Sequence, residues 1–167
     1  MNHFEQCPCP ICKGDILFHL PERPKIKSLY IIGALKNKNI PQFANEIEAL
    51  GFEAFADWFS PGSEADSKWR EYSIARGLNY KQALQSYGAK HIFEFDKFHL
   101  DRCDAAVLLA PAGKSAHTEL GYTIGKGKPG FIVFDEDLPD RFDVMVQFAT
   151  RIFFSKQEFF QYLKENN

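Results

Sequence analysis

The segment from residue 104 to residue 129 constrains the fold of this chain more than any other part of its sequence. An apolar run over 104–110 is followed by a glycine turn at Gly113 and by a helical pattern from Ser115 to Lys126, which Gly127 ends. A short apolar run bounded by turn residues is typical of a strand that is buried on both faces. A buried strand followed by a helix is half of a βαβ unit, so the segment predicts a parallel sheet covered by helices.

The rest of the chain repeats this alternation. Further strands are predicted over 29–33, 52–56, 91–93, 130–135 and, at an edge, 151–154. Further helices are predicted over 41–50, 68–86 with an interruption near Gly77, 97–102, 141–149 and from Ser155 onward, where Ser155-Lys-Gln-Glu158 has the capping-box pattern. We expect a flavodoxin-like or Rossmann-like α/β domain over 28–167, with a doubly wound parallel sheet of about five strands and helices on both faces.

Composition indicates an ordinary globular protein. A chain of 167 residues with 45% hydrophobic content can bury one substantial core. The formal net charge of −2 gives no general attraction to nucleic acid or to anionic membranes. No apolar run approaches the roughly 20 residues of a membrane span, and no signal-peptide pattern is present. We therefore expect a cytoplasmic protein that binds neither membranes nor nucleic acid.

Residues 1–27 are expected to form an appendage rich in cysteine and proline. Cys9-Pro-Ile-Cys12-Lys-Gly is a turn of the kind that supplies two thiolates to a structural zinc ion. A second CxxC pair is absent from the sequence, so Cys7 with Cys103, or His3 or His19, would have to complete the site. Two interpretations stay open: zinc bound by Cys7, Cys9 and Cys12, or a tail with reduced thiols. Nothing points to secretion, so we expect no disulfide framework.

The helix after the glycine turn carries the first candidate for chemistry. Ser115 and Glu119 are four positions apart and share one helix face. With Ser115 near the N-cap, its hydroxyl and the free N–H groups would bind a phosphate or sugar oxygen, and Gly113 would give a ligand room. In the first turn Glu119 would stay ionised and could attack an electron-poor carbon. The alternative is a serine that caps the helix and a glutamate that only complements its dipole.

Two aspartates flank the predicted helix 97–102. Asp96 follows the predicted strand 91–93 and would lie at the same sheet edge as Glu119, as a general acid or a partner of the leaving group. Its alternative role is to start the next helix. Asp104 lies at the opposite end of its strand, so we expect it to be structural.

The first two strands add candidate binding residues. Gly33 would let a ligand approach the backbone after the first strand, which also carries Tyr30. Asp57, Trp58 and Phe59 begin a long loop after the second strand. An aromatic pair beside a carboxylate suits stacking on a nucleobase, although either ring could instead anchor the loop to the core.

These residues resemble those of the nucleoside 2-deoxyribosyltransferase-like superfamily, which includes base-exchanging transferases and nucleoside-monophosphate N-glycosidases. The resemblance covers residues 29–135 and rests on Tyr30-Ile-Ile-Gly33, on Asp96 with the segment to Asp104, and on Gly113-Lys-Ser115, Glu119-Leu-Gly121 and Gly127-Lys-Pro129.

The resemblance implies that Glu119 is the nucleophile at the sugar C1′ and that Asp96 orients the sugar or protonates the leaving base. Ser115 would face the 5′ side of the sugar, while Tyr30 and Gly33 would line the pocket floor. It implies no cofactor for catalysis. It also implies a homo-oligomer, because several of these transferases complete the pocket with a neighbouring subunit.

We therefore expect an enzyme that cleaves or transfers the N-glycosidic bond of a nucleoside or nucleotide. A carboxylate beneath the sugar would stabilise or capture the positive charge that this reaction builds. Water would complete a hydrolase and a second base a transferase, and the sequence does not separate them. Ala34-Leu-Lys-Asn-Lys38 lacks the small-residue and serine character of the monophosphate hydrolases. Two alternatives stay open, an NAD-cleaving glycohydrolase and a non-catalytic nucleotide sensor or adaptor with a zinc-binding tail.

Overall fold

A single parallel sheet organises the computed structural model, which describes residues 25–135 and 143–166. Its strand order is β2-β1-β3-β4-β5, and all neighbouring strands run in the same direction. The strands are β1 Ser28–Ile32, β2 Glu53–Phe55, β3 Ala105–Leu109, β4 Gly130–Val133 and β5 Arg151–Phe153. This is the flavodoxin-like order and confirms the predicted α/β class.

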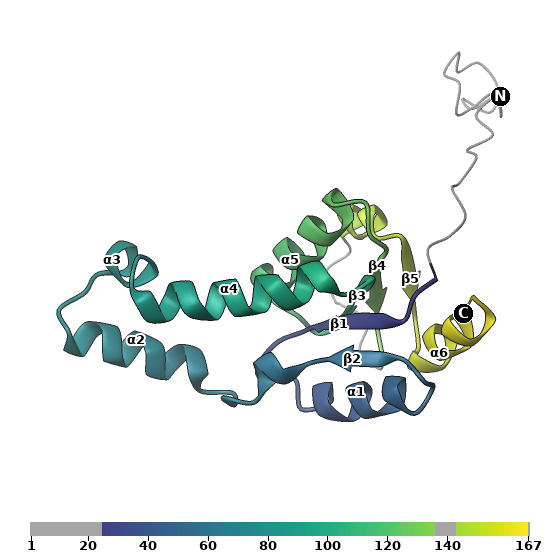
Figure 1. Cartoon of the computed structure of the whole chain (residues 1–167), viewed down its shortest axis with the longest axis horizontal. Coiled ribbons are helices and arrows are strands. Elements are labelled where there is room, and N and C mark those ends of the chain that lie inside the picture. The colour runs from purple at the N-terminus through teal and green to yellow at the C-terminus, as the bar shows by residue number, and fades with distance from the viewer. Residues whose placement is uncertain (1–24, 136–142, 167) are drawn as a thin grey trace, which may run out of the picture.

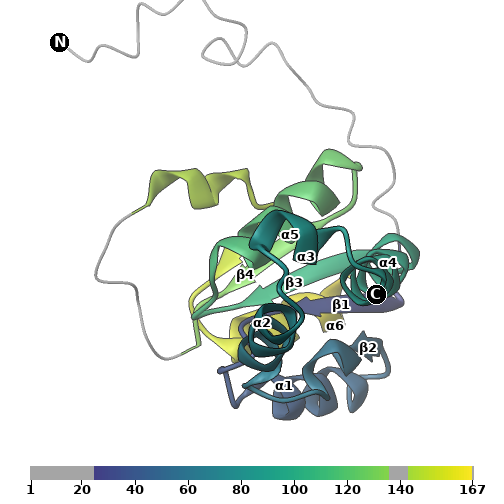
Figure 2. The same ribbon diagram turned by 90° about the vertical axis from the view of Figure 1, so that its left-hand side faces the viewer.

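Helices cover both faces of the sheet (Figures 1 and 2). One face packs against α1 (Ile40–Glu48) and α6 (Lys156–Glu165), and the other against α4 (Tyr87–Arg102) and α5 (Lys114–Gly125). Alternate residues of a strand serve opposite faces, so Leu29 packs on the α1 side and Tyr30 on the α4 side. Both faces are therefore buried, which explains why the central strands are apolar throughout.

A helical arm projects from this body (Figure 1). It consists of α2 (Ala65–Ala75), α3 (Tyr80–Leu84) and the first part of α4, and we call residues 65–98 the helical arm. Gly77, with a φ of +71°, ends α2 in the left-handed conformation and confirms the predicted interruption. The arm's helices, like the others that the structure describes, are too short or too polar to cross a membrane.

The strand predicted over 91–93 is wrong, because this segment lies inside α4. Ser86 caps that helix by accepting a hydrogen bond from the N–H of Ala89, and the helix continues to Arg102 through the separately predicted 97–102. A capped start and the burial of Leu100 against the sheet outweigh the strand preference of isoleucine and phenylalanine. The helix predicted over 141–149 is a 3₁₀ helix, Val144–Phe148, within its described part.

Two polar side chains have the structural roles predicted for them. Ser155 caps α6 by accepting a hydrogen bond from the N–H of Glu158. Asp104 Oδ2 accepts hydrogen bonds from the N–H groups of Lys27 and Ser28 and from the Ser28 hydroxyl, at 2.9–3.0 Å. Burial acts to raise the pKa of Asp104, but these hydrogen bonds outweigh it and hold the pKa below its ordinary value. Asp104 thus ties the start of β3 to the start of β1.

Candidate active site

Glu119 was predicted in the first turn of its helix, but it lies in the second turn of α5. The helix starts one residue earlier than expected, at Lys114, with Gly113 as its N-cap. Ala116 and Leu120 turn toward the sheet, which leaves Glu119 half-buried at the margin of the packed face. Its carboxylate makes no hydrogen bond or ion pair with any described residue.

Asp96 was predicted to follow a strand, but it lies on α4. It is half-buried, and no described residue donates a hydrogen bond to its carboxylate. The Tyr122 hydroxyl of α5 donates a 2.8 Å hydrogen bond to Asp101 of α4, which holds the two helices side by side. Asp96 and Glu119 therefore interact electrostatically across these two helices.

Tyr30 lies on β1 and interacts electrostatically with both Asp96 and Glu119. Its side chain is 2% exposed, and its hydroxyl has no hydrogen-bond partner among the described residues. The neighbouring residue in β3 is Ala106, whose small side chain takes little space on this face. Burial raises the pKa of Tyr30 strongly, and the negative charges of Asp96 and Glu119 raise it further. The three polar groups thus lie within electrostatic reach of one another.

The surroundings of both carboxyl groups raise their pKa, and that of Glu119 lies near neutral pH. Burial raises the pKa of Glu119 to about 7, and the negative charge of Asp96 adds to the shift. Burial also raises the pKa of Asp96. Neither anion has a hydrogen bond to offset its lost hydration. Carboxyls held in this way mark functional sites more often than structural ones, and such a pair can divide into one acid and one base.

The N-terminus of α5, which precedes Glu119 in the same helix, is open. Gly113 is exposed with free space around it, and no side chain caps the helix. Ser115 lies inside the first turn instead of at the predicted N-cap, and its exposed hydroxyl has no partner among the described residues. The unpaired N–H groups and this hydroxyl could donate hydrogen bonds to an anionic group of a ligand held at Glu119.

Trp58 and Gly33 have packing roles. The Trp58 indole donates a 2.7 Å hydrogen bond to the Ile31 carbonyl, one residue beyond the point where β2 ends opposite Tyr30. The ring packs against the cores on both faces of the sheet. A Cβ on Gly33 would overlap Ile40 Cδ1 and lie 3.7 Å from the Trp58 ring. The interpretation of Trp58 as an anchor of its segment is thus the one that the contacts support.

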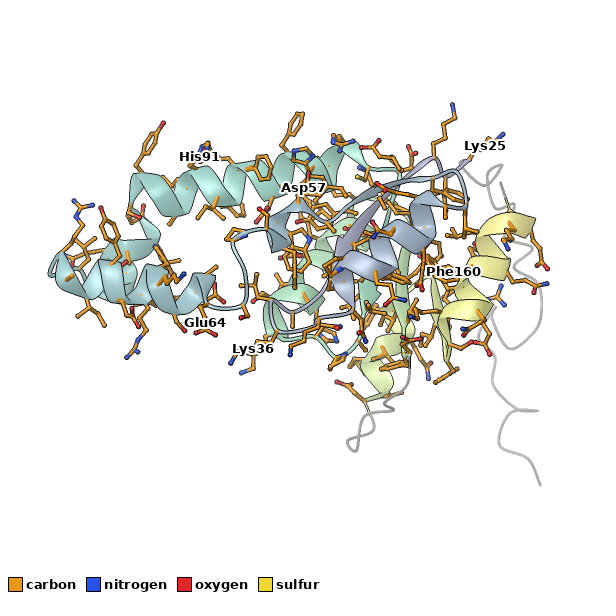
Figure 3. The ribbon with its side chains drawn as sticks, turned by 90° about the horizontal axis from the view of Figure 1, so that it is seen from below. Lys25, Lys36, Asp57, Glu64, His91 and Phe160 are labelled. Atoms are coloured by element: carbon orange, nitrogen blue, oxygen red, sulfur yellow. The ribbon has the colours of Figure 1, made fainter. Side chains whose placement is uncertain are left out.

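Asp57 and Phe59 flank that tryptophan in a 3₁₀ helix, Asp57–Phe59, where a loop was predicted. Asp57 is exposed, as Figure 3 shows, and interacts electrostatically with His99. The Phe59 ring meets Trp58 edge-on at 5.8 Å and lines a hollow of about 380 Å³ with Lys36 and Lys38. Phe59 lines this hollow and Asp57 does not. Neither residue contacts Asp96 or Glu119 in the contacts described.

His99 is a candidate that sequence reasoning missed. Its ring stacks on Phe55 at 3.8 Å, and Phe55 packs against Tyr30 at 5.3 Å. Burial, followed by the charge of Arg102, lowers the pKa of His99. Arg102 Nε donates to Nδ1, so the neutral ring carries its proton on Nε2. The sequence could have indicated His99 by its position three residues after Asp96. Residues at this spacing share a face only within a helix, so the indication depends on knowing that 87–102 is one helix.

The larger of the two described hollows lies elsewhere, on the other flank of α5. It measures about 610 Å³ and is lined largely by apolar groups, among them Ile124, Met145 and Phe148. Neither this hollow nor the one beside Phe59 is lined by Asp96 or Glu119. The larger hollow is also lined by Lys114, His117 and Asp143. The carboxylate pair is the stronger candidate for chemistry, because burial raises the pKa of both groups. In a single chain they are not enclosed by either hollow.

The predicted zinc ligands Cys7, Cys9 and Cys12 lie outside the described residues, as do His3 and His19. Within residues 25–135 and 143–166, no three histidine, cysteine, aspartate or glutamate side chains are grouped as a metal site. Cys103 is 1% exposed in the core on the α4 side, and burial raises its pKa to about 11. A thiol in that position is not accessible to a zinc ion held by a tail.

Comparison with known proteins does not assign this chain to a family. No protein-family model matches the sequence, and no curated protein matches it at a significant level.

Proposed function

We propose that this protein cleaves or transfers the N-glycosidic bond of a nucleoside or nucleotide, with Glu119 as the nucleophile. The observation that carries the proposal is the pair of half-buried carboxylates, Glu119 and Asp96, which have no hydrogen-bond partner among the described residues. The resemblance of residues 29–135 to the nucleoside 2-deoxyribosyltransferase-like superfamily points to the same two residues.

The chemistry follows from the protonation states of the pair. Ionised Glu119 attacks C1′ of the sugar, the C1′–N bond breaks, and its electron pair goes to the base. Protonated Asp96 donates a proton to the leaving base, for which a raised carboxyl pKa is required. Water or a second base then attacks C1′, and the Glu119 carboxylate leaves. The Tyr30 hydroxyl can donate a hydrogen bond to the Glu119 carboxylate and hold it in position.

The other elements of the proposal follow from the sequence. Ser115 and the open first turn of α5 would bind the 5′ side of the sugar. The reaction needs no cofactor, and a zinc ion on Cys7, Cys9 and Cys12 would be structural. We propose a cytoplasmic enzyme of nucleotide metabolism that acts as a homo-oligomer.

The test is release of free base from a panel of deoxynucleosides and their monophosphates, with and without an acceptor base. We expect the wild-type protein to release or exchange base from at least one substrate, and Glu119→Gln to be slower by about 10⁴-fold, because the nucleophile is lost. Glu48→Gln is the matched control, since Glu48 is an exposed carboxylate of α1 on the other side of the sheet. It should retain full activity.

Equal base release by wild-type protein and Glu119→Gln would contradict the assignment. Release of nicotinamide from NAD, with no turnover of the panel, would replace the substrate and keep the chemistry. Tight nucleotide binding without any turnover would indicate a sensor.

A further inference from the structure

The larger hollow, on the flank of α5 that does not carry Glu119, has the form of a small-molecule site. Its volume of about 610 Å³ lies within the range of about 300–1,000 Å³ that such sites occupy. Residues of α5 line one side of it, and residues of the 3₁₀ helix η3 (Val144–Phe148) line the other. Its walls include the apolar side chains of Leu120, Ile124, Ile132 and Met145. An apolar hollow with a few polar groups is the usual form of a ligand site.

Among the described residues that line this hollow, three have polar side chains, and each keeps a free group. The Lys114 ammonium group makes no ion pair with any described residue. His117 Nδ1 lies 2.8 Å from the Gly113 carbonyl, which can only accept, so the neutral ring carries its proton there and leaves Nε2 as an acceptor. Asp143 Oδ1 accepts a hydrogen bond from the N–H of Met145, and no described residue donates to Oδ2.

The two charges of opposite sign are kept apart at this hollow. Lys114 is the first residue of α5, and Asp143 is the N-cap of η3. Both line the hollow, yet they form no ion pair with each other. A ligand that fills the hollow displaces water from both charges, and a charge that loses water costs free energy unless it is paired. The ligand therefore has to bring an anionic group for Lys114 and a cationic donor for Asp143.

We infer that this hollow binds an apolar zwitterion, either a free amino acid with a large apolar side chain or a short apolar peptide. The carboxylate of the ligand pairs with Lys114. Its ammonium group donates hydrogen bonds to Asp143 Oδ2 and His117 Nε2, and its apolar side chains pack against the apolar walls. The site is independent of the proposed function, because the two candidate catalytic carboxylates do not line this hollow.

A nucleotide matches the same hollow less well. Lys114 could pair with its phosphate, but the edge of a nucleobase carries hydrogen-bond acceptors as well as donors. The side chains of Asp143 and His117 offer the base only acceptors, and the other described side chains that line the hollow are apolar. A base acceptor that is buried without a donor costs free energy. The polar groups of the hollow thus favour a zwitterion.

The test is isothermal titration calorimetry of the full chain with leucine, phenylalanine and the dipeptide leucyl-leucine. We expect at least one of them to bind saturably at one site per chain. Glycine and diglycine carry the two charges without the apolar part, whereas the N-acetyl and C-amide forms of the bound compound each lack one charge. Each of these should bind at least about tenfold more weakly. Tighter binding of the dipeptide than of both amino acids would identify a peptide as the ligand, and the reverse a free amino acid.

Two substitutions test the assignment of the charges. Lys114→Met removes the cation, so this variant should no longer distinguish the ligand's carboxylate from its amide. Asp143→Asn keeps an oxygen for the N–H of Met145 but removes the anion, so it should no longer distinguish the ammonium group from its acetylated form. A variant that simply unfolds would lose binding of every form alike. Lys90→Met and Glu48→Gln change exposed residues that do not line the hollow, and both should keep the wild-type selectivity.

Three results would overturn the inference. The first is the absence of saturable binding of all three compounds by the wild-type protein at concentrations up to about 10 mM. The second is selectivity that stays unchanged in both Lys114→Met and Asp143→Asn. The third is binding of a nucleoside monophosphate that these two substitutions weaken, together with no binding of the zwitterions.

Discussion

The Glu119 carboxyl differs from other acidic side chains such as Asp101 because no described residue donates a hydrogen bond to it or forms an ion pair with it. Asp101 shows the contrast, since hydrogen bonds from Lys97 and Tyr122 lower its pKa. Asp96 lies five residues earlier in the same helix and has no such donor, and burial raises its pKa. The position of a carboxyl relative to hydrogen-bond donors thus decides whether its pKa is raised or lowered.

This contrast predicts the pH dependence of the reaction. The reactive pair carries one proton, on Asp96, while Glu119 is ionised. Because burial and the charge of Asp96 raise the pKa of Glu119, the pair loses its last proton near pH 7, so kcat/KM should fall as pH rises through about 7. Asp96→Asn removes both the proton donor and a charge that raises the pKa of Glu119, so its rate should fall by about 10²- to 10⁴-fold and the decline near pH 7 should disappear. The measurement is kcat/KM against pH for both proteins. A decline near pH 7 that persists in Asp96→Asn would mean that it does not report this pair.

At the scale of elements, the short 3₁₀ helix after β2 supplies a hydrogen-bond donor to a backbone carbonyl of β1. The strand β2 ends at Phe55, and the following 3₁₀ helix supplies the Trp58 indole as the donor to the Ile31 carbonyl. The same ring fills the space beside Gly33, directly after β1. This segment therefore holds the end of the strand that carries Tyr30.

Trp58→Phe should lower the free energy of unfolding by about 1–3 kcal/mol, because the Ile31 carbonyl loses its donor while an aromatic ring remains. Urea unfolding followed by circular dichroism measures the effect. Trp69→Phe is the matched control, because Trp69 lies on the arm and has only an edge contact with Tyr80. We expect less than about 1 kcal/mol there. A loss no larger for Trp58 than for Trp69 would show that the hydrogen bond to Ile31 has no stabilising role.

At the scale of the whole molecule, the strand order explains where the site lies. The chain crosses to opposite faces after β1 and after β3, which are neighbours in the sheet. Ligands of open α/β sheets bind at such a switch point. Here Tyr30 lies on β1, and Glu119 lies on the helix that follows β3. The arm that carries Asp96 extends beyond the body (Figure 1).

If the second chain completes the site, specific activity should fall on dilution. We expect activity per chain to decrease over the concentration range in which sedimentation equilibrium detects monomer, because each site then lacks the neighbouring subunit of the proposed homo-oligomer. The measurement is the initial rate of base release against protein concentration, with Phe148→Ser as a variant that should follow the wild-type curve. Constant specific activity across dimer dissociation would show that each chain holds a complete site.

The fold class followed from local patterns, because a parallel sheet buried on both faces needs short apolar strands wherever it occurs. The strands at 29–33, 104–110 and 130–135 were predicted for this reason. Asp104 was predicted to be structural, but its hydrogen bonds to Lys27 and Ser28 were not predicted. The helical structure of 91–93 was not predicted, because these residues suit either a strand or a helix. The cap at Ser86 and the burial of Leu100 decide in favour of the helix.

The sequence by itself determined the α/β class, the succession of most elements and the choice of Glu119 and Asp96 as candidates. Only the tertiary structure decided how these carboxylates meet, from two adjacent helices and beside a tyrosine of β1. It also decided that Trp58 and Gly33 serve packing and that large apolar side chains of the arm are exposed among the described residues. Spacing along a chain fixes which residues share an element, whereas burial, charge coupling and unpaired hydrogen-bonding groups depend on which elements pack together.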